Sequence, residues 1–437
     1  MGLNHIQWLL GELPALQREG VIDDPAADRL RRHYAAQTKP GRNWALTAFG
    51  ILGGTLIGLG ILLLLAHNWA DLSRVTRTAL AFAPLVASLG LAGWVLAAGK
   101  TSAAWRESVG LFWMLSVGTS IALVAQTYHI PGDAGRFALT WMLLTLPIVY
   151  LLQSTGPALV YLAGITFWAT DAQNGGGHSA GYWLLAALLL PHTISAFRAN
   201  AYSLRASLLG WGYALAFCVA TGITLEKVMP GLWIMVYAGL FACLYLAGTF
   251  WFDDTPSFWQ RPFRAVGSFG AIVLALMLTY RWPWNSIGWR FYRVHESIHP
   301  WAVLLDYVWA VALPVAAIAL LVASVRRGKA HAIWLGALPI VAVAGYSLAA
   351  GGDRIAAATL LFNAYLLAVG LAQLIHGLRR SRLGTVNGGL FVLFALILIR
   401  FFDAGLGFIA RGLVFVALGI AFLLANLFLA RRKGAAS

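Results

Sequence analysis

The amino-acid sequence predicts an all-α, polytopic integral membrane protein with about 14 transmembrane helices. The chain has 437 residues, of which 60% are hydrophobic and only 11% are charged, whereas a soluble protein carries roughly 25% charged residues. Long apolar segments alternate with short polar ones, as in chains that cross a membrane repeatedly. Strict alternation of apolar and polar residues is absent, so the spanning elements are expected to be helices rather than the strands of a barrel.

Residues 1–42 are predicted to form a small cytoplasmic helical leader. Apolar residues recur there at helical spacing from Ile6 to Leu16. A second helix is expected to start with Asp24 as its N-cap and Pro25 at its first position. We interpret the segment as a polar leader in preference to a hairpin that docks a cytoplasmic protein partner, because so short a pair can hardly bury a core alone.

The membrane domain is predicted over residues 43–430, and a basic cytoplasmic tail over residues 431–437. The spans are expected near 45–66, 78–98, 108–126, 137–153, 157–171, 180–197, 204–223, 231–252, 264–281, 302–325, 331–350, 354–377, 384–402 and 409–430.

The positive charges predict the orientation of these spans. About two thirds of the 31 Lys and Arg residues fall in segments that are inside when the N-terminus is placed in the cytoplasm. The even number of spans then puts both termini in the cytoplasm. The net charge of +15 is gathered in small clusters at span ends, which favours a lipid bilayer as the partner and argues against nucleic acid.

The middle of the predicted spans contains no Asp, Glu, Lys or Arg, although ion-coupled carriers commonly place an ionisable group there. Polar groups at this depth are neutral, and we interpret them as hydrogen bonds between helices rather than as a transport path. They include Thr119, Ser120, Asn363, Gln373 and Asn426.

A short pattern at the outer end of the first span recurs at the third. An aromatic residue is followed by Asp, then by Arg three residues later, and then by Pro ten or eleven residues after the Arg. The two copies contain His67, Asn68, Trp69, Asp71, Arg74 and Pro84, and Gln126, Thr127, Tyr128, Asp133, Arg136 and Pro147. Looser copies close the eleventh and thirteenth spans, at Tyr346, Asp353 and Arg354 and at Arg400, Asp403 and Arg411. The pattern indicates repeated helical hairpins of one design, with the repeats parallel.

Two interpretations of this outward layer are open. In the structural one, aromatic side chains lie at the headgroup level and each Asp–Arg pair caps a helix end. In the functional one, the ends converge on a polar cavity that binds an anionic or sugar-bearing ligand, with Arg as the partner of a phosphate. The candidate ligand-binding residues are His67, Asn68, Trp69, Asp71, Arg74, Gln126, Tyr128, His129, Asp133, Arg136, Asp353, Arg354, Arg400, Asp403 and Arg411.

The loop between the ninth and tenth predicted spans contains His295-Glu296-Ser297-Ile298-His299. On a helix, the two imidazoles could bind zinc, with Glu296 as the general base. Pro300 follows directly and disfavours helical geometry at His299, and no third ligand follows at metalloprotease spacing. A zinc site of His295, Glu296 and His299 is therefore the minor interpretation, and an incidental or structural role is the major one.

Both ends of the chain resemble a known family. The similar segments are the glycine-rich run into Ala66-His67-Asn68-Trp69, the stretch Gln126-Thr127-Tyr128-His129 with Gly132, Asp133 and Trp141, and the closing Arg400-Phe401-Phe402-Asp403 with Arg411. They resemble bacterial predicted membrane proteins that carry domain of unknown function 2157. The resemblance does not extend to the middle of the chain, roughly residues 155–330. The resemblance implies a multi-pass protein of the bacterial inner membrane, and it carries over no activity and no catalytic residue.

The sequence leaves three functions open. The leading hypothesis is a translocator or binder of a lipid-linked or anionic envelope ligand, based on the many spans, the short loops and the outward Asp/Arg/aromatic layer. The second is a non-transporting membrane scaffold or regulator whose N-terminal hairpin docks a partner. The third, and less favoured, is a membrane-bound enzyme, either a zinc metalloprotease or a glycosyl transferase that uses outer carboxylates such as Asp71.

Overall fold

A computed structural model of the chain describes residues 12–35 without 15 and 18, residues 72–288 and residues 300–403, with gaps, and scattered residues between 409 and 423. The gaps are 176–178, 226–229, 253–256, 286, 353 and 381–382. The first predicted span and most of the last lie outside the described residues, as do the candidates His67, Asn68, Trp69, Asp71, His295, Glu296, His299, Asp353 and Arg411.

The chain divides into a first unit, residues 1–77, and a second unit, residues 78–437. The first unit contains α2 (Asp24–Ala35), preceded by short helical stretches between residues 12 and 17. Leu13 and Ala27 are fully buried there, so the two helical segments cover apolar side chains.

The start of α2 corrects one prediction. Asp23 Oδ1 accepts a hydrogen bond from the backbone N–H of Ala26 at 2.9 Å, and a bond to the third residue onward is the geometry of an N-cap. Asp23 therefore caps the helix, and the predicted cap at Asp24 is wrong by one residue. Asp24 instead accepts a bond from Gln17 Nε2 at 2.9 Å, which links the two helical segments.

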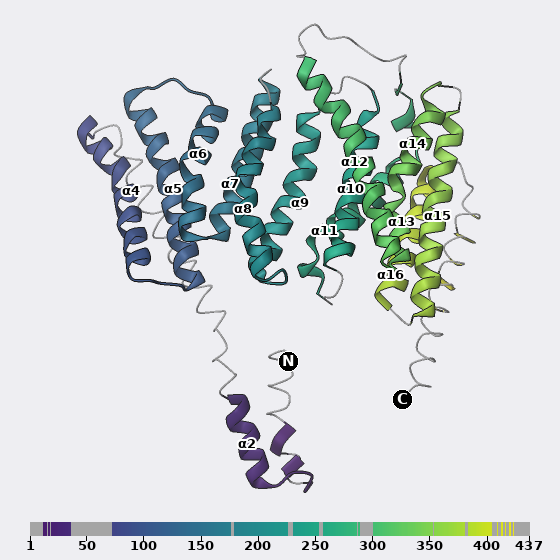
Figure 1. Cartoon of the computed structure of the whole chain (residues 1–437), viewed down its shortest axis with the longest axis horizontal. Helices are drawn as coiled ribbons and strands as arrows, with labels where there is room; N and C mark the ends of the chain where they lie inside the picture. The colour runs from purple at the N-terminus through teal and green to yellow at the C-terminus, as the bar shows by residue number, and fades with distance from the viewer. Residues whose placement is uncertain are drawn as a thin grey trace. The chain divides into compact units, whose positions relative to one another are not determined.

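The membrane helices run side by side, broadly in chain order (Figure 1). They are α4 (Arg74–Ala97), α5 (Ala103–Tyr128), α6 (Ala134–Leu152), α7 (Thr155–Asn174), α8 (Tyr182–Ala199), α9 (Leu204–Thr224), α10 (Leu232–Trp251), α11 (Pro262–Met277), α12 (Pro300–Arg326), α13 (Ile333–Gly336), α14 (Leu338–Ala349), α15 (Ile355–Arg379) and α16 (Leu383–Asp403). Short 3-10 turns join some of them, among them η2 (Ser179–Gly181), η4 (Trp282–Trp284) and η6 (Ala330–Ala332).

Each predicted span between 78–98 and 384–402 coincides with helix. Within the described residues, nine stretches are long and apolar enough to cross a membrane, judged by length and composition alone. The helix α11 and the apolar part of α16 are shorter, and α7 ends in the polar sequence Thr-Asp-Ala-Gln-Asn. The multi-helical membrane fold is thus confirmed, while the count of 14 and the N-in/C-in orientation stay predictions.

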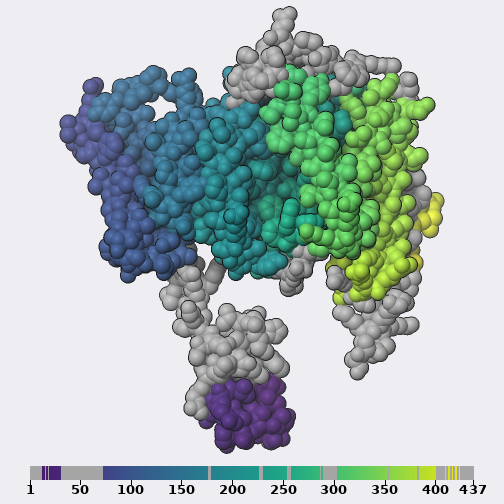
Figure 2. Space-filling view, in the orientation of Figure 1, coloured from purple at the N-terminus to yellow at the C-terminus, as the bar shows by residue number. Residues whose placement is uncertain are grey.

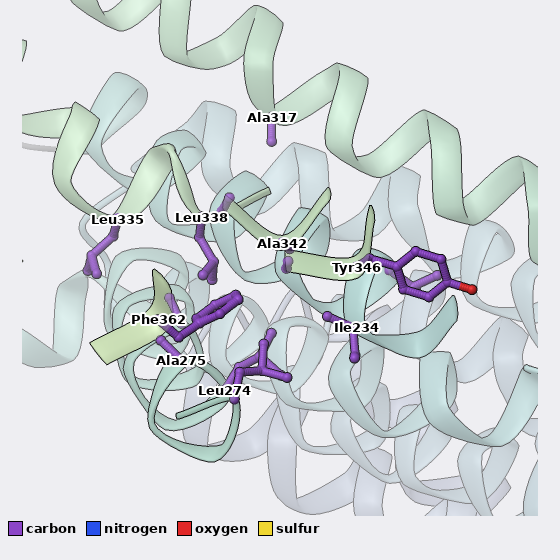
Figure 3. Close-up of a cluster of buried hydrophobic side chains, with 14 of the residues drawn as sticks. Ile234, Leu274, Ala275, Ala317, Leu335, Leu338, Ala342, Tyr346 and Phe362 are labelled. Carbon is purple, nitrogen blue, oxygen red and sulfur yellow. The ribbon is translucent and has the colours of Figure 1, made fainter. Parts of the chain in front are cut away.

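Two large hydrophobic cores lie within the second unit, besides a small cluster between α9, α10 and α11 and another between α15 and α16. The first core is formed by side chains of α4 to α9, including the fully buried Met114, Met142 and Tyr161. The second core is formed by side chains that lie mainly on α10 to α16. Figure 3 shows part of it, where Leu274 of α11 and Phe362 of α15 lie close together, with labelled side chains of α10, α12 and α14 around them. The helix α10 is central, because 67% of its most apolar stretch is buried, whereas only 22% of the corresponding stretch of α4 is.

Proline lies inside four of the membrane helices, at Pro84, Pro147, Pro191 and Pro314. A proline lacks the N–H that would bond to the carbonyl four residues earlier, and it disturbs the neighbouring bond as well. Side chains of other helices donate to carbonyls next to two of these breaks. Ser120 Oγ of α5 donates to the carbonyl of Ala81 at 2.7 Å, and the Tyr150 hydroxyl of α6 donates to the carbonyl of Leu188. Neighbouring helices thereby satisfy polar backbone groups that lipid cannot.

Candidate functional site

The predicted candidates at the junction of α5 and α6 form a helix cap. Asp133 Oδ1 accepts a bond from the backbone N–H of Arg136 at 2.7 Å, and so it is the N-cap of α6. Its other carboxylate oxygen lies 3.1 Å from Nε of Arg136, with the side chains 53% and 85% exposed, respectively. This pair has the arrangement expected in the structural interpretation of the outward layer.

Three neighbouring candidates are also exposed at this junction: Gln126, Tyr128 and His129. The Tyr128 hydroxyl lies 3.1 Å from the hydroxyl of Thr78 on α4. His129 terminates α5 in the left-handed conformation, with φ of 51°. Such a residue ends a helix, and the role is more often filled by glycine.

Asp171 of α7 joins this group, although the sequence did not single it out. A Cβ atom built on Gly135 would overlap an Asp171 carboxylate oxygen and would lie 3.4 Å from Asp133 Oδ1. Two carboxylates therefore lie at the N-terminus of α6, where the helix dipole favours negative charge. A side chain at Gly135 would therefore require the Asp171 carboxylate to move.

The remaining described candidates lie elsewhere. Arg74 is the first residue of α4 and belongs to the first unit. Arg354 is the exposed N-cap of α15, and only the backbone of Arg400 and Asp403, within α16, is described. The helices α5 and α6 pack closely with α7, whereas α15 packs closely with α11, α13, α14 and α16. The structure thus does not bring Arg354 to the Asp133–Arg136 pair.

A different polar site lies where the first core meets α12. Asp306, in the second turn of α12, is only 1% exposed. One turn later, the ring of Trp309 lies 4.8 Å from the ring of Trp183 on α8, measured between centroids. Trp183 also contacts Phe217 of α9 at 5.4 Å. We call Trp183, Asp306 and Trp309 the seam site.

The seam site has unused hydrogen-bonding capacity. The indole N–H groups of both Trp183 and Trp309 are buried, and neither has a hydrogen-bond partner among the described atoms. Buried indoles usually find an acceptor. The helix α12 packs along α10, and it reaches α8 through the two indole rings. In Figure 2 the surface is recessed between the teal helices that include α9 and the green α12.

The seam site was missed because its members are 126 positions apart at the extremes (183 to 309) and each is ordinary alone. One signal was present. Asp306 is an acidic residue inside a predicted span, four residues from its start, and an ionisable residue in a span is a functional candidate by default. Asp306 lies near the start of its predicted span, away from the middle where carriers commonly place an ionisable group.

The structure does not test the zinc prediction. Where side chains are described, no group of three or more His, Cys, Asp or Glu residues could hold a metal ion. His295, Glu296 and His299 lie outside that part of the chain.

The apolar helices and the two cores define the class of the molecule as a multi-pass helical membrane protein. Residues 14–158 match the model of a family described as "Predicted membrane protein (DUF2157)". This is the family that the sequence resembles, and the match confirms the resemblance from the N-terminal helices to the start of α7. In the same comparisons, no curated protein and no solved structure matches the chain.

Proposed function

We propose that this protein binds a lipid-linked ligand with a sugar-bearing headgroup at the seam site, in the bacterial inner membrane, and moves it within or across the bilayer. In the predicted orientation, the seam site lies toward the outer side, because α8 and α12 both begin there. The observation that carries the proposal is the burial of two indole N–H groups without acceptors where α8 meets α12, one turn from the buried Asp306.

The chemistry of the seam site suits hydroxyl groups. A carboxylate accepts hydrogen bonds from sugar hydroxyls, and an indole N–H donates to their oxygens. The indole faces also offer apolar contact to the flat side of a sugar ring, and sites of this kind combine apolar walls with a few placed polar groups. An ionised Asp306 would repel an anion, so the negative charge favours a sugar over a phosphate at this position.

Binding of a glycolipid tests the proposal. The full chain in lipid nanodiscs would be titrated with a radiolabelled glucosyl diacylglycerol, and with the same diacylglycerol lacking the sugar. Trp309→Phe removes the N–H and keeps an aromatic ring, so affinity for the glycolipid is expected to fall about threefold to tenfold. Asp306→Asn is expected to weaken binding as well. Trp251→Phe is the matched control, because Trp251 is exposed at the far end of α10.

The proposal fails if the chain binds both lipids equally, or if folded Trp309→Phe and Asp306→Asn proteins keep the affinity of the original. Movement is read separately, from the rate at which a fluorescent glucosyl diacylglycerol becomes accessible to a membrane-impermeant quencher in proteoliposomes. Binding without accelerated movement would make the protein a binder rather than a translocator.

The first unit favours a second candidate function, a scaffold that docks a cytoplasmic partner. Its described segments bury Leu13 and Ala27 completely and are joined by the bond from Gln17 to Asp24, which supports a docking role for this hairpin. Deletion of residues 1–40 separates the two functions. A scaffold would lose a partner in pull-downs from membranes, whereas a glycolipid binder would keep its affinity.

A further inference from the structure

A second polar cluster lies at the opposite end of the helices of the first core. It is formed by Glu107 of α5, Ser154 before α7, His192 of α8 and Arg205 in the first turn of α9. In the predicted orientation this end faces the cytoplasm. None of these residues belongs to the seam site or to the outward candidates.

The acidic member of the cluster, Glu107, already accepts hydrogen bonds with both of its carboxylate oxygens. Glu107 Oε1 accepts a bond from the backbone N–H of Thr155 at 2.6 Å, and Oε2 accepts one from that of Gly156 at 2.7 Å. Both carboxylate oxygens thus cap the N-terminus of α7, where the helix dipole stabilises negative charge. Glu107 therefore serves α7 as a cap.

The histidine is arranged as an acceptor. His192 is 3% exposed, and its Nε2 lies 3.3 Å from Nη2 of Arg205. A guanidinium group has only donors, so Nε2 must carry the lone pair and the imidazole is neutral in this contact. The ring also contacts Tyr150 edge-on, at 5.8 Å between centroids, which fixes its plane. The cluster consequently gains no positive charge from His192.

Arg205 keeps a net charge and an unused donor. Nε of Arg205 is buried and has no hydrogen-bond partner among the described atoms. Arg106 is close enough to add a second positive charge to the field at Arg205. Against these two cations stands the single carboxylate of Glu107.

Ser154 supplies an independent observation. The residue is fully buried, and its hydroxyl has no hydrogen-bond partner. A Cβ atom built on Gly110 of α5 would lie 2.9 Å from this oxygen, so the hydroxyl lies beside α5, one turn above Glu107. A buried hydroxyl and a buried guanidinium N–H, both without acceptors, indicate that an acceptor is missing from this place.

We infer that the cluster binds a phosphate group, with Arg205 as the main partner, Ser154 as a second donor and Arg106 as a source of attraction. Phosphate oxygens are acceptors that match the planar guanidinium, and basic sites between helices on the cytoplasmic side bind phospholipid headgroups. The phosphate of such a headgroup and free phosphate share this chemistry. The seam site plays no part, so the two proposals stand or fall separately.

The test compares three variants of the full chain. Arg205→Gln removes the charge, Arg205→Lys keeps the charge but loses the fork of donors, and Arg198→Gln is the control, because Arg198 is exposed in the last turn of α8 at the same end. Native mass spectrometry would count phosphatidylglycerol molecules retained from mixed micelles. In parallel, inorganic phosphate would be titrated while the thermal unfolding midpoint is followed.

Arg205→Gln is expected to weaken phosphate binding about tenfold to a hundredfold, as is typical for the loss of hydrogen bonds to a charged group. Arg205→Lys should weaken it less, and Arg198→Gln should leave it unchanged. Retention of phosphatidylglycerol that depends on Arg205 assigns the site to a lipid headgroup, and stabilisation by inorganic phosphate that depends on Arg205 assigns it to free phosphate. If Arg205→Gln does not fold, Arg205→Lys is the deciding variant. The inference is overturned if folded Arg205 variants bind both probes as tightly as the original chain, or if the original binds neither.

Discussion

The two cores of the membrane domain are packed by different means. In the second core, some glycines let helix backbones touch, while others face side chains. A Cβ atom on Gly267 of α11 would overlap the backbone of Tyr245 on α10, and one on Gly239 would lie 2.7 Å from the backbone nitrogen of Pro314. In the first core, glycines instead make room for side chains. Gly118 faces the ring of Trp141, and Gly164 faces the side chain of Met142.

This difference has a physical consequence. Two backbones in contact cannot shift independently, so α10, α11 and α12 form a stiff framework. Side chains that fill holes can change rotamer, and the first core also contains the charged cap of Glu107 and the cluster around Arg205. The seam site lies where the adaptable core meets the stiff one.

A matched pair of glycine substitutions tests this difference between the two cores with the largest expected effect. Added Cβ atoms at Gly267 and Gly164 would overlap their neighbours to the same extent, but the neighbour is backbone at Gly267 and a flexible Met142 side chain at Gly164. Gly267→Ala is expected to destabilise by about 3 kcal/mol, and Gly164→Ala by about 1 kcal/mol. Thermal unfolding midpoints of the detergent-purified chains would measure both. Equal losses would show that the two cores do not differ in stiffness.

The next largest effect is expected at Glu107. Glu107→Gln keeps the shape of the side chain but removes its charge and one of the two oxygens that accept hydrogen bonds from the backbone N–H groups of Thr155 and Gly156. The substitution should therefore lower the free energy of unfolding by about 2 kcal/mol. Hydrogen exchange would localise the change, with faster exchange at the start of α7 and no change in α12 to α15. Glu19→Gln, at an exposed position of the first unit, is the control. Uniformly faster exchange would mean that the two cores unfold as one.

The smallest effects are expected at the outward pair. Asp133→Ala removes the cap of α6 and should cost about 1 kcal/mol. Arg136→Ala should cost about 0.5 kcal/mol or less, because the ion pair is largely exposed and screened by solvent. The unfolding midpoint would again be the measurement. A larger loss for Arg136→Ala than for Asp133→Ala would argue that Arg136 has a role beyond its partner.

The helices were predictable because each depends on a local apolar run. The span expected at 157–171 is the helix Thr155–Asn174, and its extra turn is polar, which is why hydropathy alone shortened it. The Asp133–Arg136 pair was also predictable, since a spacing of three residues fixes the contact. By contrast, the sequence does not show which helices are neighbours in space. Glu107 reaches Thr155 across 48 positions, and Arg205 reaches His192 through the turn between two helices.

The prolines of α4 and α8 bear on how the chain enters the membrane during synthesis. Segments emerge in order from the N-terminus, so Pro84 arrives before the helix that carries Ser120, whereas Pro191 arrives after the helix that carries Tyr150. The carbonyl near Pro191 therefore meets its donor on insertion. The carbonyl near Pro84 must wait for the next helix, and α4 and α5 are accordingly best inserted together, as one hairpin.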